Sequence, residues 1–297
     1  MKRLLLVLVA LLAATGCTAA GESRSSVVVT TNILGDITRA IVGEQAPVTV
    51  LMKPNADPHS FGISAQQAAE TERAGLIVYN GLGLEEGMLR NVQAAQESGV
   101  PVLPVGERVN PIGYAGGDAL DPHFWTDPGR VRDAVTVIAE QVIAQVDGVD
   151  ATVVRANADR YRGEIDALEA TMTERFAQIP AERRKLVTNH HVFGYLAQRF
   201  GFEVIGAVVP GGTTLASPSA SDLKSLADAV RAAGVPAIFA DSSQPDRLAR
   251  VLAEQAGLHV AVTPLFSESL SEPGQGAATY LEMMRANTEA IATSLNP

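Results

Sequence analysis

The sequence has almost no cysteine: Cys17 is the only one in 297 residues. A disulfide within the chain is therefore excluded, and the folded protein must be held together by packing alone. The sequence also lacks any run rich in Lys or Arg, and 23 basic residues against 33 acidic ones give a formal net charge of −10. This balance argues against a nucleic-acid partner, because binding to a phosphate backbone depends on clustered positive charge.

Aromatic residues and hydrolase motifs are scarce as well. Phe, Trp and Tyr make up 5% of the chain, so the sequence offers no obvious aromatic patch for adhesion to another surface. Neither HExxH nor GxSxG occurs, which argues against the common zinc and serine hydrolases. What is present is an ordinary globular composition, 46% apolar and 19% charged, long enough for two domains or one large one.

The one long apolar run lies near the N-terminus, between Leu4 and Ala14, after two basic residues. It is too short to cross a bilayer as a helix, so residues 1–16 are predicted to be an export signal peptide. The stretch "AATGC" resembles a bacterial lipobox, in which Cys17 would be acylated after cleavage, although ordinary cleavage after a small residue is the alternative. In both cases we expect an extracytoplasmic protein with a flexible spacer over 17–26, and no other segment in the membrane.

The rest of the chain alternates strand-like and helix-like segments. Short apolar runs such as "SVVVTTNI", "PVTVLM" and "LIVYNG" are separated by segments with helical spacing of apolar residues, which indicates parallel sheets covered by helices. From about Asp127 to Pro180 the pattern is continuously helical, too long for a crossover within one sheet. We therefore predict an α/β fold of two lobes, residues 27–145 and 182–297, joined by a long rigid helix over 146–181.

Three of the five histidines follow predicted strands. His59 and His123 occur in similar settings, "ADPHSF" and "LDPHFW", and His190 ends the strand "KLVTNH". In open parallel sheets ligands bind at the carboxyl ends of the strands, so the three imidazoles can meet in one cleft. The aspartate two residues before each of the first two can fix the backbone or the ring through a hydrogen bond. Neutral imidazoles are common zinc ligands, so the sequence predicts a metal site.

A tetrahedral zinc site with three histidines needs one more donor. Two acidic residues lie just past later strands: Asp241 in "IFADSS" and Glu268 in "PLFSESL". From the residues alone, both stay candidates for the fourth ligand.

Together these motifs carry a family resemblance. "MKPNADPHSF", "IVYNGLGLEEGML", "DPHFWTDP", "TNHHVFGYLAQRFG" and "FSESL" resemble, in the right order, the metal-binding solute-binding proteins of zinc and manganese ABC transporters, of the cluster A-I type. The resemblance runs from about Val27 to the C-terminus. It implies two α/β lobes joined by a long helix, one metal ion buried between them, and delivery of that ion to a membrane permease.

The resemblance also implies a ligand set. The first two ligand histidines of the family match His59 and His123, and the third, three residues before the aromatic residue of "FGY", falls on His190. The fourth family ligand is commonly Asp, and the matching residue here is Glu268. Asp241 matches a position that is often acidic in the family without being a ligand, and His191 is expected to point away from the metal.

The donor set favours Zn²⁺, one per chain, with Mn²⁺ as the alternative. Manganese prefers more oxygen donors and lies low in the Irving–Williams order, and the manganese-type relatives often carry Glu where this chain has His190. The loop before His123 has none of the extra histidines found in many zinc-uptake relatives, so a separate zinc chaperone is a possible partner. We expect a monomer that acts with an ABC permease and is not an enzyme; an extracytoplasmic zinc hydrolase and an adhesin are the rival classes.

Overall fold

The computed structural model describes residues 24–114, 119–209, 211–257 and 261–296. The predicted signal peptide, Cys17 and most of the predicted spacer lie outside these residues. Within them, no helix combines the length and apolar character needed to cross a bilayer.

The first lobe is built on a parallel sheet in the order β2-β1-β3-β4. Its strands are β1 (Val27–Val29), β2 (Val48–Val50), β3 (Leu76–Tyr79) and β4 (Val102–Pro104). The helices between them are α2 (Asn32–Val42), α3 (Ala65–Glu72), α4 (Leu89–Glu97) and α5 (Val105–Arg108). Both faces of this sheet are covered, since Val27 and Val29 pack into one buried cluster and Val28 into another. This two-sided burial explains strands that are apolar throughout.

The second lobe repeats the same topology, with the strand order β6-β5-β7-β8. Its strands are β5 (Lys185–Thr188), β6 (Glu203–Ala207), β7 (Ala237–Asp241) and β8 (Ala261–Leu265), all parallel. The helices are α8 (Gly194–Phe200), α9 (Ala220–Ala233), α10 (Arg247–Gln255) and the C-terminal α11 (Tyr280–Leu295). A short 3-10 turn, η2 (Ala181–Arg183), precedes β5 at the start of this lobe. Adjacent residues of β7 again enter two different clusters, which places buried side chains on both faces.

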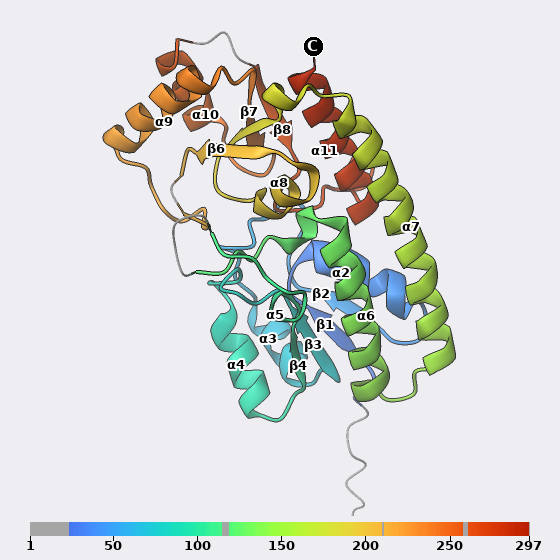
Figure 1. Ribbon diagram of the computed structural model, residues 1–297. Coiled ribbons are helices and arrows are strands. Elements are labelled where there is room, and N and C mark those ends of the chain that lie inside the picture. Colours follow the sequence, from blue (N-terminus) through green and yellow to red (C-terminus); the bar gives the residue numbers. More distant parts are fainter. Residues whose placement is uncertain (1–23, 115–118, 210, 258–260, 297) are drawn as a thin grey trace, which may run out of the picture.

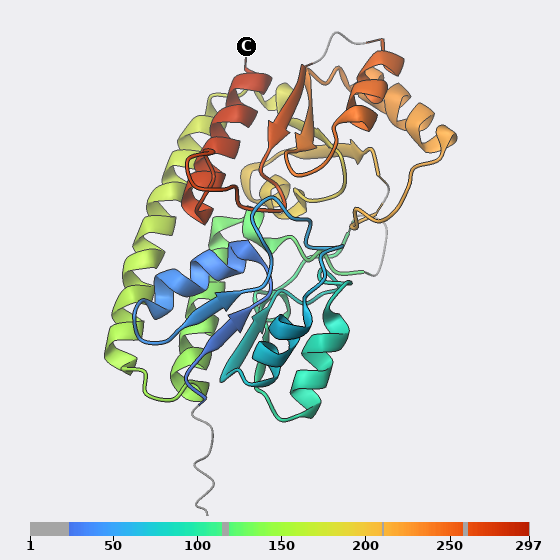
Figure 2. The same cartoon turned by 180° about the vertical axis from the view of Figure 1, so that it is seen from behind.

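A pair of long helices lies between the two sheets in the sequence: α6 (Pro128–Gln145) and α7 (Ala151–Ala177), preceded by the 3-10 turn η1 (Phe124–Thr126). Figure 1 and Figure 2 show α7 running beside both lobes. The prediction of one continuous helical stretch is wrong at a single point. Gly148 adopts a positive φ of 80°, and Asp150 then caps a new helix by accepting from the backbone N–H of Thr152 at 2.8 Å.

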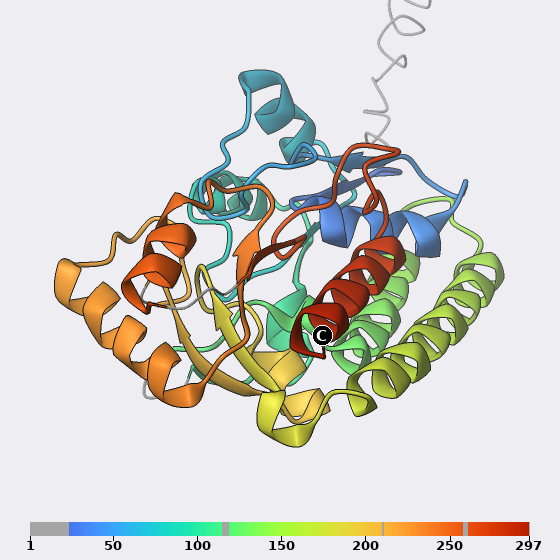
Figure 3. The ribbon, with the colours of Figure 1, turned by 90° about the horizontal axis from the view of Figure 1, so that it is seen from above.

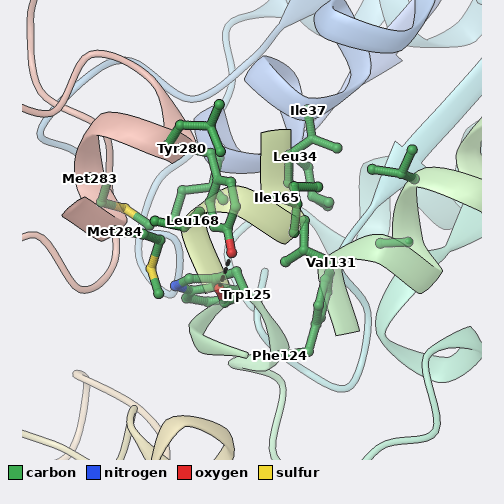
Figure 4. Packing of buried hydrophobic residues seen from close by; sticks show 14 of the residues in the cluster. Leu34, Ile37, Phe124, Trp125, Val131, Ile165, Leu168, Tyr280, Met283 and Met284 are labelled. Atoms are coloured by element: carbon green, nitrogen blue, oxygen red, sulfur yellow. Dashed lines mark hydrogen bonds between the residues drawn. The ribbon is translucent and has the colours of Figure 1, made fainter. Parts of the chain in front are cut away.

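One buried apolar cluster extends through both lobes. Seen from above, α11 and α7 lie side by side (Figure 3), and the two helices are in contact. Figure 4 shows residues of α2, α6, α7 and α11 packed around Trp125, with the Tyr280 hydroxyl donating to the Trp125 carbonyl at 3.0 Å. Because this shared core would have to break for the lobes to separate, the architecture favours small relative motions.

The predicted α/β architecture of two lobes is confirmed. Three elements of the first lobe, α4, β4 and α5, were not predicted: "PVLPV" contains two prolines, the cap of α4, Met88, makes no side-chain cap bond, and α5 has only four residues. The exact boundaries 27–145, 146–181 and 182–297 stay a prediction.

Candidate metal centre

Four side chains from both lobes converge at the carboxyl ends of the two sheets. His59 lies in the loop after β2, His123 directly before η1, His190 two residues after β5, and Glu268 three residues after β8. One donor atom from each lies within 4.8 Å of the others, and all four residues are buried. The position follows from topology, because strands that run parallel deliver the loops at their carboxyl ends to one edge.

The distances place the carboxylate among the three imidazoles. Glu268 Oε1 lies 2.7 Å from His190 Nε2 and 3.3 Å from His123 Nε2, and Glu268 Oε2 lies 3.8 Å from His59 Nε2. The ring centroids are 5.4 to 5.7 Å apart. In tetrahedral zinc sites with ligand bonds near 2.1 Å, donor atoms are separated by about 3.4 Å. Small side-chain adjustments therefore bring these four donors to zinc-binding distances.

Several donor atoms at this centre are buried and have no hydrogen-bond partner. They are Nε2 of His59, Nε2 of His123 and Oε2 of Glu268. Burying unpaired polar atoms is costly, and native structures avoid it unless something else satisfies them. A cation bound between these atoms accounts for all three.

The charges within the centre are strongly coupled. Burial by itself lowers the pKa of His123, but Glu268 and Asp121 outweigh it and raise that pKa to about 10. Burial opposes ionisation of Glu268, yet its interactions with the His123 and His190 side chains bring its pKa below the usual range. Burial lowers the pKa of His59. Without metal at neutral pH, the centre thus holds an ionised Glu268, a protonated His123 and a neutral His59.

The two aspartates predicted to fix the histidines act differently. Asp121 Oδ1 accepts from both the backbone N–H of His123 and its Nδ1, at 2.9 and 2.7 Å, so it fixes the ring as predicted. Asp57 accepts from the backbone N–H of His59 at 2.9 Å and from the Thr214 hydroxyl at 2.6 Å, but His59 Nδ1 has no partner. For His59 the predicted hydrogen bond is therefore the one to the backbone: Asp57 positions the loop and also contacts the other lobe.

The loop that carries Glu268 rests on Asp241. Asp241 Oδ2 accepts from the Ser267 hydroxyl at 2.5 Å and from the backbone N–H groups of Ser267 and Glu268, both at 3.2 Å. Its carboxylate is not part of the four-residue cluster. Burial first, and then the charge of Glu268, raise the pKa of Asp241. The structure thus places Asp241 beneath the loop, where it holds the backbone of Glu268.

The same loop is also bound from the first lobe, through residues that the sequence analysis missed. The Trp125 indole N–H donates to the Ser267 carbonyl at 2.9 Å. The Asn32 side chain donates to the Ser269 hydroxyl at 2.7 Å and accepts from the backbone N–H of Leu270 at 2.9 Å. Asn32 lies in the strand-like sequence run "SVVVTTNI", whereas in the structure it is the first residue of α2.

His191, the neighbour of His190, is not part of the cluster. Its ring is half-buried and lies against Tyr114, with centroids 6.4 Å apart. The prediction that only one of the two adjacent histidines faces the centre agrees with this placement.

Comparisons with known proteins identify the family. Residues 27–294 match the family ZnuA, described as the periplasmic component A of a zinc-uptake complex. The chain is 31% identical over 290 residues to the zinc-binding protein TroA of Treponema pallidum, covering 93% of this chain and 91% of that one. It is 26% identical over 296 residues to the manganese-binding lipoprotein MntA of Halalkalibacterium halodurans, covering 98% and 97%.

The fold leads to the same group of proteins. The solved structure of the periplasmic zinc-binding protein TroA superposes with a TM-score of 0.85 at 29% identity, covering 93% of this chain and all of that one. Sequence and fold agree over nearly the full described length. The chain therefore belongs to the ZnuA family of metal-binding receptors of ABC transporters.

Proposed function

We propose that this receptor captures one Zn²⁺ ion between its lobes and delivers it to an ABC permease for import. The observation that carries the proposal is the buried cluster of His59, His123, His190 and Glu268. Within the described residues, three of its donor atoms have no hydrogen-bond partner. We assign these four residues as the metal ligands. All four positions of a tetrahedral ion are then filled by the protein, whereas catalytic zinc keeps a position open for water, so the donor set does not favour a hydrolase.

The choice of zinc rests on the chemistry of the donors. Three imidazoles and one carboxylate suit Zn²⁺, while Mn²⁺ favours oxygen donors and binds such sites more weakly in the Irving–Williams order. Relatives of similar identity are named for zinc and for manganese, so manganese is the second candidate. Glu268 Oε2 also faces His59, so both carboxylate oxygens are near the proposed ion position. Binding through both oxygens would favour manganese, because it adds an oxygen donor.

The cellular setting is proposed from the N-terminal sequence and the relatives. Several relatives are named as lipoproteins. We propose that residues 1–16 are removed on export and that acylated Cys17 tethers a monomeric receptor to the outer face of the membrane. A separate zinc chaperone could load it, since the segment before His123 carries no cluster of histidines.

Competition between the two metals tests the function. Mature protein, stripped of metal and titrated with Zn²⁺ against a chelator of known affinity, is expected to bind one ion per chain. Manganese should bind at least about 100-fold more weakly, as the Irving–Williams order predicts for this donor set. Equal or tighter binding of Mn²⁺ would make this a manganese receptor, and no tight binding of either ion would reject the metal-receptor function.

Zinc binding is expected to release about one proton at pH 7.5. His123, with its pKa raised to about 10, is protonated without metal and must become neutral to bind, whereas His59 and Glu268 are already in their binding forms. Since His123 holds this proton at pH values below about 10 and zinc must displace it, zinc affinity should rise about tenfold per pH unit from pH 6.5 to 8.5. Calorimetry in buffers of different ionisation enthalpy measures the proton count. A count of zero would show that His123 is neutral before the metal arrives.

A further inference from the structure

A cavity of about 520 Å³ lies in the second lobe directly beside His190. Val208 and Ala216 are among its wall residues, and Ser217 and Arg247 at its rim are exposed. His190, among its deepest lining residues, has no exposed surface. The cavity therefore leads from the surface to one proposed metal ligand, and its volume is that of an ordinary small-molecule site.

His190, like His59, is less firmly supported than His123. Its Nδ1 is buried and has no hydrogen-bond partner, whereas Nδ1 of His123 is held by Asp121. Histidines that bind metal firmly usually have a partner for the second nitrogen, which fixes the ring and strengthens the ligand. The only polar side-chain contact that the structure gives the His190 ring is the one to Glu268.

Among the described residues, His190 is the one proposed ligand whose loop has no hydrogen bond to the first lobe. His59 and His123 belong to it, and the Glu268 loop is attached to it by Trp125 and by the Asn32 side chain. The backbone N–H of Asn55 adds a further bond, to the carbonyl of Leu270 at 2.9 Å. The Glu268 loop is also held by Asp241 of the second lobe, so it is attached to both lobes, whereas His190 is attached to the second lobe alone and lines the cavity.

We propose that His190 is the exchangeable ligand of this site, and that the cavity is the route by which a small chelator with nitrogen or oxygen donors reaches the metal. A lone pair of the incoming donor forms a bond to zinc as the bond from His190 Nε2 breaks, with no change of oxidation state. The remaining ligands hold the ion until a second donor arrives. This inference rests on the proposed zinc-receptor function.

Free L-histidine serves as the probe. Zinc-loaded protein is mixed with L-histidine and an excess of a chromophoric zinc indicator, and the rate of zinc transfer is followed in a stopped-flow instrument. The rate should increase linearly with the L-histidine concentration in the wild type. Ala216→Phe, which fills the cavity, should lower that slope at least tenfold and change the equilibrium zinc affinity by less than about threefold.

Two further variants make the result specific. Ala216→Leu should give an intermediate slope, and it keeps the test valid if the larger side chain disturbs folding, which thermal unfolding reports. Ala167→Phe, at an exposed position on α7 away from the cavity, is the matched control and should behave like the wild type.

The possible outcomes distinguish a failure of the exchange route from a failure of the proposed zinc-receptor function. An unchanged slope in folded Ala216→Phe and Ala216→Leu, with stoichiometric zinc binding, overturns the route while the receptor function stands. An equal loss of slope in Ala167→Phe overturns it too. A wild type that binds no zinc rejects the receptor function, and the exchange route with it.

Discussion

Glu268→Gln is expected to lower zinc affinity by about 100-fold. Structural zinc sites with four ligands bind with roughly 10 to 16 kcal/mol in total, or about 3 kcal/mol for each ligand, which corresponds to two orders of magnitude. Gln keeps the size of the side chain but removes the negative charge that faces the three histidines at 2.7 to 3.8 Å. The measurement is competitive titration with a zinc chelator of known affinity.

Two other variants calibrate this result. His191→Ala should bind zinc like the wild type, because the His191 ring lies against Tyr114 and outside the cluster. Asp241→Asn should lose about tenfold, since changes in groups that hold metal ligands typically cost 10- to 100-fold in affinity. If Asp241→Asn lost more affinity than Glu268→Gln, Asp241 would be the ligand and Glu268 its support.

The parts of the fold that local sequence dictates could be predicted. Strands such as "VVV" and "LIVY" are buried on both faces and separated by capped helices, so the α/β pattern is visible without any tertiary information. The capping box at Ser64 is present as the sequence "SAQQ" indicates. The break between α6 and α7 was missed because its signal is weak: Gly148 and Asp150 interrupt a stretch whose composition otherwise favours helix.

The three histidines of the cluster could also be predicted as candidate ligands, because each occurs just after a strand or in a repeated Asp-Pro-His setting. The groups that hold them could be predicted only when they are neighbours in the chain, as Asp121 is for His123. The bonds from Trp125 and Asn32 to the Glu268 loop join residues 142 and more than 230 positions apart. Such contacts depend on how the two lobes pack together, which no local pattern encodes.

Zinc is expected to raise the midpoint of thermal unfolding by about 8 to 16 °C. A ligand that binds only the folded state at a free concentration 1,000 times its dissociation constant adds about 4 kcal/mol to the free energy of unfolding. For a domain of a few hundred residues, 1 kcal/mol corresponds to roughly 2 to 4 °C. An ion held by the four proposed ligands would also join loops of both lobes and satisfy buried atoms of His59, His123 and Glu268 that have no hydrogen-bond partner among the described residues.

Differential scanning calorimetry of the stripped protein, with and without zinc, measures this shift, and Mg²⁺ at the same concentration is the control because it prefers oxygen ligands. Metal-free Glu268→Gln should unfold within a few degrees of the metal-free wild type. Added zinc should then raise the midpoint of the variant much less than that of the wild type. A full rise in that variant would place the stabilising ion elsewhere on the chain. A rise with Mg²⁺ would show a general effect of divalent cations on the acidic surface, because three imidazoles give Mg²⁺ no suitable ligands.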